Sequence, residues 1–513
     1  MMTFIEDHLL SLIAFSPLLG ILVLALVQKQ KAGLMKAIAI VITLIPLSLS
    51  LYLFGAFDFN DQGYQFEEEV SWIELQMPSM EQQSLQINYE LGVDGLSVSL
   101  ILLTAVVGTL SAVASIYIKK RWKAYFILFF LLQVGMFGVF MAKNLFLFFI
   151  FFELTIIPMF FLIAIWGYLN RESAANTFLI YNGIGSAVML IAFVALFAIT
   201  DTLNIPALEV MVSQLTSQSV SGWPYAIPPG DVIFFIFVAL LFAFAVKLPI
   251  FPLHSWMLKV HVEAPPAIVM IHSGILLKLG AYGLIRLGIG VFPEQFERVA
   301  YILAILGVVN ILYGAVLAFV QNDLKKVLAY SSVSHMGIVL LGIAALNYSG
   351  LQGAIFQVIS HGLISSLLFF IIGVIYERTE TSMISDLGGL AKNMPFVCGV
   401  FLAGAMANLG LPGMSGFISE FLSFLGLFNT YPVVAAIGVL GIILTAVYLL
   451  RAVLNTTFGP AKEEWAHLSD ARGFEVVPMA ILLGFIVLIG VYPSVLSETL
   501  DLSIQIFLAR IGG

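Results

Sequence analysis

The stretch FAFAVKLPIFPLHSW, residues 242–256, decides the fold of this chain. It begins as an apolar, membrane-type helix and places Lys247 two residues before Pro249, where nothing else nearby is charged. Proline removes a backbone donor and clashes with the preceding turn, so within lipid it is tolerated only where neighbouring groups or cavity water satisfy the freed carbonyls. A charge at that depth costs at least about 2.5 to 3.5 kcal/mol on insertion scales. The stretch therefore predicts a discontinuous membrane helix that lines a polar site.

A second stretch, ANLGLPGMSGFISEF at 407–421, repeats this pattern, with Gly410 and Pro412 ahead of Glu420. A single break of this kind is also typical of a packing kink in a membrane helix. Two breaks, each beside a buried charge, favour transport. Because they fall five spans apart, they suggest two inverted five-helix repeats that each contribute one discontinuous helix to a site near the middle of the membrane.

The composition indicates a polytopic membrane protein, because 61% of the 513 residues are hydrophobic and only 10% are charged. A span needs about 20 apolar residues. Apolar runs of this length are centred near residues 18, 45, 106, 132, 155, 188, 240, 278, 309, 336, 364, 408, 444 and 486. We therefore expect an all-α polytopic membrane protein of about fourteen transmembrane helices, with helices 7 and 12 discontinuous.

The repeats divide the expected fold into four parts. Residues 1–120 hold helices 1–3 and an acidic outer loop, 121–290 the first repeat (helices 4–8), 291–457 the second (helices 9–13), and 458–513 helix 14. Within the outer loop, the alternating stretches 64–73 and 85–89 predict a short hairpin. Asp94, directly after it, is placed to cap the helix that follows.

The basic residues predict the orientation. Sixteen of the 22 lie in loops after odd-numbered spans, and loops rich in Lys and Arg stay on the cytoplasmic side. Both termini are therefore expected outside, in a multi-pass protein of a bacterial plasma membrane, with the lipid bilayer as its surroundings. A net charge of −8 argues against nucleic acid as a partner.

Cysteine usage and the missing nucleotide motifs bound the chemistry. One cysteine, Cys398, excludes a disulfide framework and cysteine-ligated iron–sulfur clusters. Since no glycine-rich phosphate loop follows a predicted strand, a nucleotide or flavin site is not expected. No cofactor and no metal is expected on this chain, and any redox chemistry that it serves would lie on another chain.

Four charges inside apolar runs are the candidate functional residues: Glu153, Lys247, Lys278 and Glu420. Glu153 has apolar neighbours for a turn on either side, so it needs a proton or a cation from another helix, and Lys247 is its natural partner. A static salt bridge is the alternative. Lys278 has no carboxylate in its own helix, which favours a hydrated proton carrier, and Glu420 lies where a broken helix can reach a water-filled exit.

Two histidines complete the candidate site. His335 and His361 fall mid-span with serines nearby, and imidazole suits proton hopping near neutrality, although a buried histidine is also common as a satisfied core residue. His254, His261 and His272 cluster around the loop after the first break. Without cysteine or tight spacing they make a weak metal site.

Several long motifs also resemble one known family. The motifs are 151–159 (FFELTIIPM), 247–266, 275–286 (ILLKLGAYGLIR), 321–337, 360–370 and 411–421. Together they resemble the antiporter-like membrane subunits of proton-pumping NADH:quinone oxidoreductase, respiratory complex I. The resemblance runs from GVDGLS, 92–97, to the last spans. Glu420, where the sister branches L and N carry lysine, and the end of the chain soon after helix 14 favour the M-type branch.

The resemblance implies a role for each candidate residue. It makes Glu153 and Lys247 the ion pair of the uptake half-channel and Lys278 the central lysine, with His335 and His361 bridging by water toward Glu420. Pro249 and Pro412 mark the helix breaks. One residue departs from the family: Thr177 stands where related subunits often carry another lysine.

The resemblance also implies an assembly. Protons would be moved by redox chemistry elsewhere, with NADH, FMN, iron–sulfur clusters and quinone on partner subunits, and with the antiporter-like neighbours L and N and small subunits as membrane partners. Three alternatives stay open from the sequence: a subunit of a multisubunit sodium/proton antiporter, a membrane subunit of a proton-pumping hydrogenase, and a structural scaffold.

Overall fold

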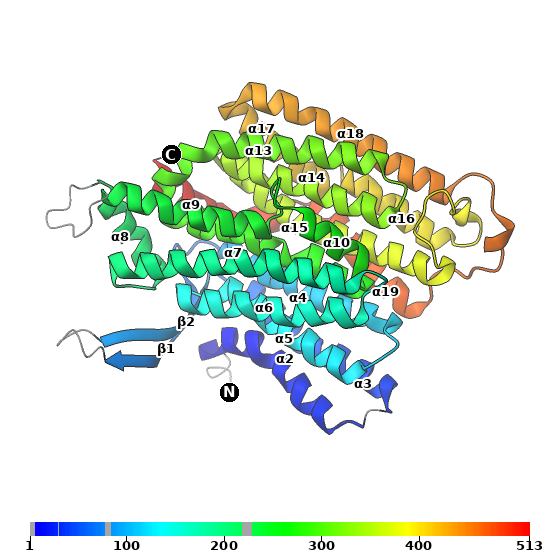
Figure 1. The fold of residues 1–513 in the computed structure, drawn as a ribbon, viewed down its shortest axis with the longest axis horizontal. Coiled ribbons are helices and arrows are strands. Elements are labelled where there is room, and N and C mark those ends of the chain that lie inside the picture. Colours follow the sequence, from blue (N-terminus) through cyan, green and yellow to red (C-terminus); the bar gives the residue numbers. More distant parts are fainter. Residues whose placement is uncertain (1–5, 29, 77–83, 218–227, 513) are drawn as a thin grey trace.

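The structure is a computed structural model, and it describes residues 6–28, 30–76, 84–217 and 228–512. Most of the long helices run side by side along the longest axis of the molecule (Figure 1). Thirteen helices among the described residues are long and apolar enough to cross a membrane. With the interrupted twelfth span, this confirms the predicted fourteen.

The spans before the first break are α2 (Leu9–Leu26), α3 (Ala32–Ala56), α4 (Gly95–Ala114), α5 (Trp122–Met141), α6 (Leu145–Trp166) and α7 (Arg171–Thr200). The seventh span is divided into α9 (Pro229–Lys247) and α10 (Ser255–Glu263). After the eighth span follow α13 (Pro293–Val320), α14 (Leu324–Ala344) and α15 (Tyr348–Thr379). The twelfth span is divided into α16 (Pro395–Asn408) and α17 (Ser415–Thr430), and α18 (Pro432–Thr457) and α19 (Gly473–Val491) close the bundle. Both predicted discontinuities are confirmed.

The eighth span, Pro266–Ile289, departs from a regular α-helix. It consists of α11 (Pro266–Ile271), a π-helical turn at His272–Leu276, α12 (Lys278–Gly283) and a second π-helical stretch at Leu284–Ile289. A π-helical turn widens the helix and frees backbone carbonyls, and such turns are frequent at functional sites. The sequence analysis did not predict it.

Two further helices were not predicted either. They are α8 (Ile205–Ser217) and α20 (Ser494–Ile511), which packs against α4, α13 and α15. The Arg510 guanidinium of α20 lies 2.5 Å from the Glu209 carboxylate of α8, so the two helices are joined by an ion pair.

The predicted hairpin is confirmed and is longer than expected. The strands β1 (Gln65–Gln76) and β2 (Ser84–Val93) pair antiparallel with Val70 opposite Tyr89, and the intervening 77–83 lie outside the described residues. The hairpin projects from one end of the helix bundle (Figure 1).

Acidic side chains anchor this end of the molecule. Glu68 of β1 is turned inward and accepts the backbone N–H groups of Leu10 (2.8 Å) and Ser11 (3.0 Å), which lie in the first turn of α2. Asp94 accepts the backbone N–H of Ser97, as expected for the cap of α4. It also lies 2.6 Å from the guanidinium of Arg286, which is 4% exposed, so a buried ion pair joins α4 to the eighth span.

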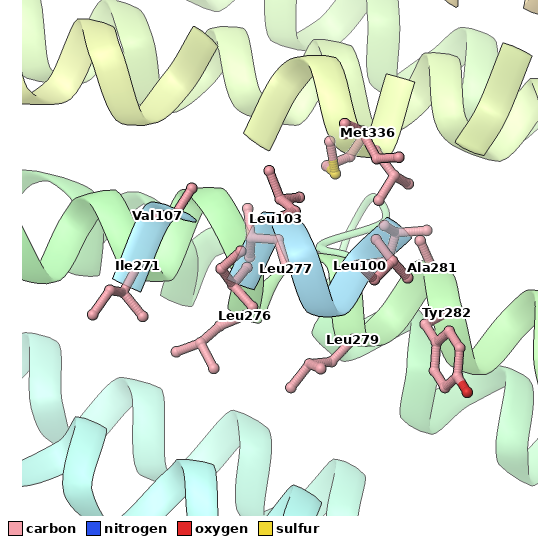
Figure 2. Close-up of a cluster of buried hydrophobic side chains, with 14 of the residues drawn as sticks. Leu100, Leu103, Val107, Ile271, Leu276, Leu277, Leu279, Ala281, Tyr282 and Met336 are labelled. Atoms are coloured by element: carbon pink, nitrogen blue, oxygen red, sulfur yellow. The ribbon is translucent and has the colours of Figure 1, made fainter. Parts of the chain in front are cut away.

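Four helices form the centre of the bundle. The spans of α4, the eighth span, α14 and α15 are between 94 and 100% buried within the molecule, whereas less than half of the α7, α9, α18 and α19 spans is buried. Figure 2 shows the apolar packing at this centre, where Leu103 and Val107 of α4 lie near Leu276 and Leu277 of the eighth span, with Met336 of α14 opposite. Lys278, His335 and His361 are therefore carried by the most enclosed helices. The inverted repeats and the four-part division remain predictions.

Candidate functional site: a buried chain of ionisable residues

At the first helix break, neutral side chains form hydrogen bonds with the backbone groups that the break frees. Asn310 of α13 is fully buried; its side-chain oxygen accepts the backbone N–H of Phe251 (2.7 Å), and its amide donates to the carbonyl of Pro249 (3.3 Å). The indole N–H of Trp256 donates to the carbonyl of Val246 at 3.0 Å. Backbone groups that the break frees are thus satisfied within the protein, as the membrane interior requires.

Lys247 ends α9 at this break and is 1% exposed. Its ammonium has no hydrogen-bond partner and lies 4.7 Å from the centre of the Phe152 ring. Glu153 follows Phe152, and its head group forms no ion pair with Lys247; Oε1 of Glu153 is also buried without a partner. The structure thus places Lys247 beside the residue that precedes Glu153, but the two predicted partners form no ion pair. Because an unpaired buried charge is strongly unfavourable, small movements or proton exchange are needed to relieve it.

Lys278 is in direct contact with the next predicted residue. It is fully buried, and its amine lies 2.7 Å from Nδ1 of His361 on α15 and donates to the carbonyl of Ser273 at 2.9 Å. Ser273 belongs to the π-helical turn, which presents this carbonyl to the amine. The sequence analysis expected a hydrated lysine, whereas the structure supplies a direct lysine–imidazole contact.

His361 leads to His335 of α14, because their ring centres are 5.5 Å apart. His335 places Nδ1 2.8 Å from the carbonyl of Ser331 and Nε2 2.9 Å from the carbonyl of Asn408. Carbonyl oxygens only accept hydrogen bonds, so both contacts are satisfied only when both ring nitrogens carry protons. Nε2 also lies 3.5 Å from Oε1 of Glu420. The geometry therefore provides a resting place for a proton beside the last carboxylate.

The second helix break builds this resting place. Since α16 ends at Asn408, the carbonyl of Asn408 is free of a helical partner and accepts from His335. Gly410 follows in the left-handed region with φ of +78°, and a Cβ added there would lie 2.6 Å from Oε2 of Glu420. The glycine thus allows both the turn and the close approach of the carboxylate.

A hydroxyl network holds the histidine end. Ser331 accepts hydrogen bonds from the side-chain amide of Asn408 (3.0 Å) and from the hydroxyl of Tyr448 on α18 (2.8 Å). Ser331 thereby positions the carbonyl that faces His335. The chain from Lys278 to Glu420 is thus built by contacts between α12, α15, α14 and α17.

Two histidines that the sequence analysis interpreted only as a weak metal site form a buried pair. Nε2 of His261 lies 2.9 Å from Nδ1 of His272, and the outer nitrogen of each ring has no partner. The Phe178 ring lies 6.1 Å from the His272 ring and 5.9 Å from the Lys247 ammonium. The carbonyl of Ser273, next to His272, accepts a hydrogen bond from Lys278. Among the described residues, no group of three potential metal ligands occurs. The pair therefore lies in the region between the two lysines.

Asn310 and Asn408, which position the predicted groups, were not predicted from the sequence, whereas Ser331 was expected only as one of the serines near His335. A usable signal was present for Asn408. The helical donor for its carbonyl would be the N–H of the residue four positions on, and that residue is Pro412, which has none. No comparable signal marks Asn310, which meets the first break only through the fold.

Comparisons with known proteins agree with this geometry. A family model described as NADH:quinone oxidoreductase/Mrp antiporter, transmembrane, matches residues 142–445. NADH-quinone oxidoreductase subunit M of Rhodobacter capsulatus is 38% identical over 97% of this chain and 96% of its own length.

Two solved structures extend the comparison. A chain of respiratory complex I from Thermus thermophilus with bound NADH superposes with a TM-score of 0.83 and 27% identity, covering 98% of this chain and 100% of that one. A chain of the Mrp complex from Dietzia sp. DQ12-45-1b has the same fold, with a TM-score of 0.84 at 20% identity over 99% of this chain and 100% of that one. The chain belongs to the transmembrane NADH:quinone oxidoreductase/Mrp antiporter family, in the group of subunit M proteins.

Proposed function

We propose that this chain is a membrane subunit of an NADH:quinone oxidoreductase and that it translocates protons through its own buried ionisable residues. The observation that carries the proposal is the line of neighbours from Lys278 through His361 and His335 to Glu420. Its first three members lie on the most enclosed helices. A structural scaffold needs no such line, because each buried charge costs stability.

The unpartnered pair at the first break supplies the control step. A signal from a neighbouring subunit moves Glu153 toward or away from Lys247. Charges a few Å apart in a poorly polarisable interior interact by several kcal/mol, so this movement changes how strongly Lys247 holds its proton. The charge on Lys247 in turn acts across the His261–His272 pair on Lys278. The absence of an ion pair between Glu153 and Lys247 among the described residues supports a cycle in which the two groups separate.

Lys278 then passes a proton along the chain. The amine gives a proton to Nδ1 of His361, His335 receives one across the space between the rings, and Glu420 accepts the proton before release. Each group regains its starting state when the next proton arrives, so the net change is one proton moved. The ring centres of His335 and His361 are 5.5 Å apart, and the proposed transfer between them runs through one bridging water.

The position in the cell and the assembly follow from the same proposal. Basic loops place the connections after odd-numbered spans in the cytoplasm and both termini outside, in a bacterial plasma membrane. The antiporter-like neighbours L and N and small membrane subunits are the proposed partners, with NADH, FMN, iron–sulfur clusters and quinone on other chains.

Glu153→Gln and Lys247→Ala, each in the intact complex, test the proposal. Both variants should lose most proton pumping while the complex still assembles, because the control step needs both charges. Glu172→Gln, an exposed acid at the start of α7, is the matched control and should pump normally. The measurements are proton uptake into inverted vesicles and recovery of the assembled complex. Undiminished pumping in either buried variant would refute the proposal.

The second candidate function, a subunit of a sodium/proton antiporter, is favoured by the shared fold of the Mrp chain. Affinity purification through a tag on this chain, followed by mass spectrometry, separates the two. Co-purified iron–sulfur and quinone-site subunits support the redox-driven pump, whereas small hydrophobic partners without redox subunits support the antiporter.

A further inference from the structure

Arg286 is a buried cation that the proposed route does not use. It lies on the eighth span toward the hairpin end of the molecule, eight residues beyond Lys278, or about 12 Å along the axis at about 1.5 Å per residue. Its side chain is 4% exposed and is paired with Asp94, the cap of α4. A buried ion pair often adds no more stability than a well-packed apolar pair, so stability alone does not account for it.

The guanidinium of Arg286 donates hydrogen bonds in two directions. On the side facing the centre of the bundle, Nε donates to the hydroxyl of Tyr282 and Nη2 to the hydroxyl of Ser97, both at 3.3 Å. On the hairpin side, Nη1 donates to the hydroxyl of Tyr64 at 3.2 Å and Nη2 to the carboxylate of Asp94 at 2.6 Å. We call these five residues the outer cluster, with Tyr282 and Ser97 as its inner hydroxyls.

The inner hydroxyls lie between Lys278 and the hairpin end. Tyr282 is one turn beyond Lys278 on the same face of α12, and its hydroxyl lies 3.1 Å from that of Ser97. Both residues are buried. A hydroxyl group both accepts and donates hydrogen bonds, so it can pass a proton on. Without a barrier, protons could therefore leave or reach Lys278 along its own helix.

The guanidinium interrupts this path. Arginine only donates hydrogen bonds and keeps its proton in proteins, so it accepts no proton from a hydroxyl. Among the described residues, neither inner hydroxyl forms a hydrogen bond with Tyr64 or with the carboxylate of Asp94. The guanidinium is therefore the link between the two sides. Its positive charge also repels an approaching proton, and arginine excludes protons from membrane pores in the same way.

Aromatic rings pack on the guanidinium. Its central carbon lies 5.6 Å from the ring centre of Tyr64, 5.4 Å from that of Tyr282 and 5.3 Å from that of Phe507. Phe507 belongs to α20 and is 2% exposed. The three rings hinder a water path past the arginine.

Ion pairs between membrane helices also serve as packing contacts. Packing alone, however, does not require a cation that donates to hydroxyls on one side and to a second set of acceptors on the other. We propose that the outer cluster is a proton seal, which prevents protons from passing between Lys278 and the outside along the eighth span and so directs them through His361. Arg286 itself takes up and releases no proton. This inference rests on the proposed function and on its orientation.

Removing both charges of the ion pair is the first test. The double variant Asp94→Asn with Arg286→Gln keeps a polar pair and a helix cap, but glutamine is shorter than arginine and leaves room for water. The whole complex is reconstituted into liposomes without NADH. Proton entry is driven by a potassium diffusion potential with valinomycin and is followed with a pH-sensitive dye. The variant should admit protons at least severalfold faster than the parent complex.

The dependence of this leak on Lys278 separates a seal from a packing contact. Adding Lys278→Met to the double variant should return proton entry to the parental rate, because the amine that exchanges protons with the inner hydroxyls is gone. A leak that persists would come from general damage and would overturn the seal. A double variant as tight as the parent would overturn it as well.

Arg286→Lys is the second test, and it covers the case in which the double variant does not assemble. It keeps a cation beside Asp94, but a buried lysine can release its proton, whereas an arginine cannot. This variant should therefore also leak severalfold faster than the parent, again only while Lys278 is present. A tight complex with Arg286→Lys would overturn the seal.

Arg510→Gln with Glu209→Gln is the matched control. It removes the ion pair between α8 and α20 at the same end of the eighth span, where Arg510 donates to the carbonyl of Gly290 at 3.0 Å. This pair has no hydrogen bond to the inner hydroxyls among the described residues, so the control should be as tight as the parent. A control that leaks as much as the double variant would overturn the seal.

The pumping assay keeps the seal and the proposed function apart. If Glu153→Gln abolishes pumping while the seal variants stay tight, the seal is wrong and the proposed function stands. If Glu153→Gln retains pumping, the proposed function itself fails.

Discussion

The two helix breaks look alike in sequence but serve different ends in the structure. At the first break, Lys247 and Glu153 are left without partners, whereas at the second break Glu420 lies at the end of a line of close contacts that begins at Lys278. The charged groups at the first break are therefore free to change partners, whereas those leading to the second break already lie next to one another.

The difference arises from what takes up the freed backbone groups. Asn310 and Trp256 satisfy them at the first break, so Lys247 contributes nothing to the break and remains free to respond to Glu153. At the second break the freed carbonyl of Asn408 is bonded by His335 itself. A break in a membrane helix can thus either isolate a charge or incorporate it into a chain.

The largest effect is expected from His361→Phe, which keeps a ring in place but removes the nitrogen that contacts Lys278. Proton transfer by a positioned side chain contributes typically 10²- to 10⁴-fold, so pumping should fall by about 10²-fold. Proton uptake by inverted vesicles, normalised to the amount of assembled complex, measures this. Ser365→Ala, one turn along α15, is the control, because its hydroxyl has no partner. Pumping within a factor of two of the parent would show that the line from Lys278 to Glu420 is not the route.

Shortening each carboxylate by one carbon sharpens the comparison. Glu420→Asp withdraws the carboxylate from His335, which is now 3.5 Å away, so pumping should fall by about tenfold, the equivalent of roughly 1.4 kcal/mol. Glu153→Asp removes no existing contact, so proton pumping by this variant should fall by less than half. The same vesicle assay reports both. Equal losses in the two variants would mean that the two breaks do not differ as described.

An effect smaller than that of Glu420→Asp is expected at the glycines of the second break. Ala at Gly410 or Gly413 pays a similar cost of about 1 kcal/mol, because both residues have positive φ. Only at Gly410 does the new methyl group meet Glu420; at Gly413 it meets open space. Gly410→Ala should therefore slow pumping a few-fold more than Gly413→Ala at similar thermal stability of the complex. Indistinguishable pumping by the two variants would mean that the position of Glu420 does not depend on the missing side chain at Gly410.

Much of this fold was predictable because the membrane imposes simple rules. Apolar runs of a fixed length predicted the spans, and alternation in the outer loop predicted the hairpin. The two stretches that combine a charge with several prolines or glycines predicted both discontinuities, whereas the single prolines Pro17, Pro46, Pro158 and Pro478 lie inside continuous helices. The π-helical turn at His272–Leu276 was not predictable, since no local sequence pattern distinguishes a π-helical turn from an α-helical one. The amphipathic α8 and α20 were not predictable from apolar runs, because polar residues interrupt both sequences.

The site was predictable in its members and not in its contacts. A charged residue inside an apolar run is easily recognised, which is why Glu153, Lys278 and Glu420 could be predicted from the sequence. Their distances depend on how α12, α14, α15 and α17 pack, and no local pattern encodes that. Thus the direct Lys278–His361 contact and the separated Glu153 and Lys247 emerged only from the structure.

The central claim is that protons cross the membrane through Lys278. The most direct test is the number of protons pumped per NADH oxidised by the complex carrying Lys278→Met, which keeps the length of the side chain and removes its charge. The proposed route predicts that NADH oxidation continues in uncoupled vesicles while fewer protons are pumped per NADH. An unchanged ratio would contradict the route through this chain.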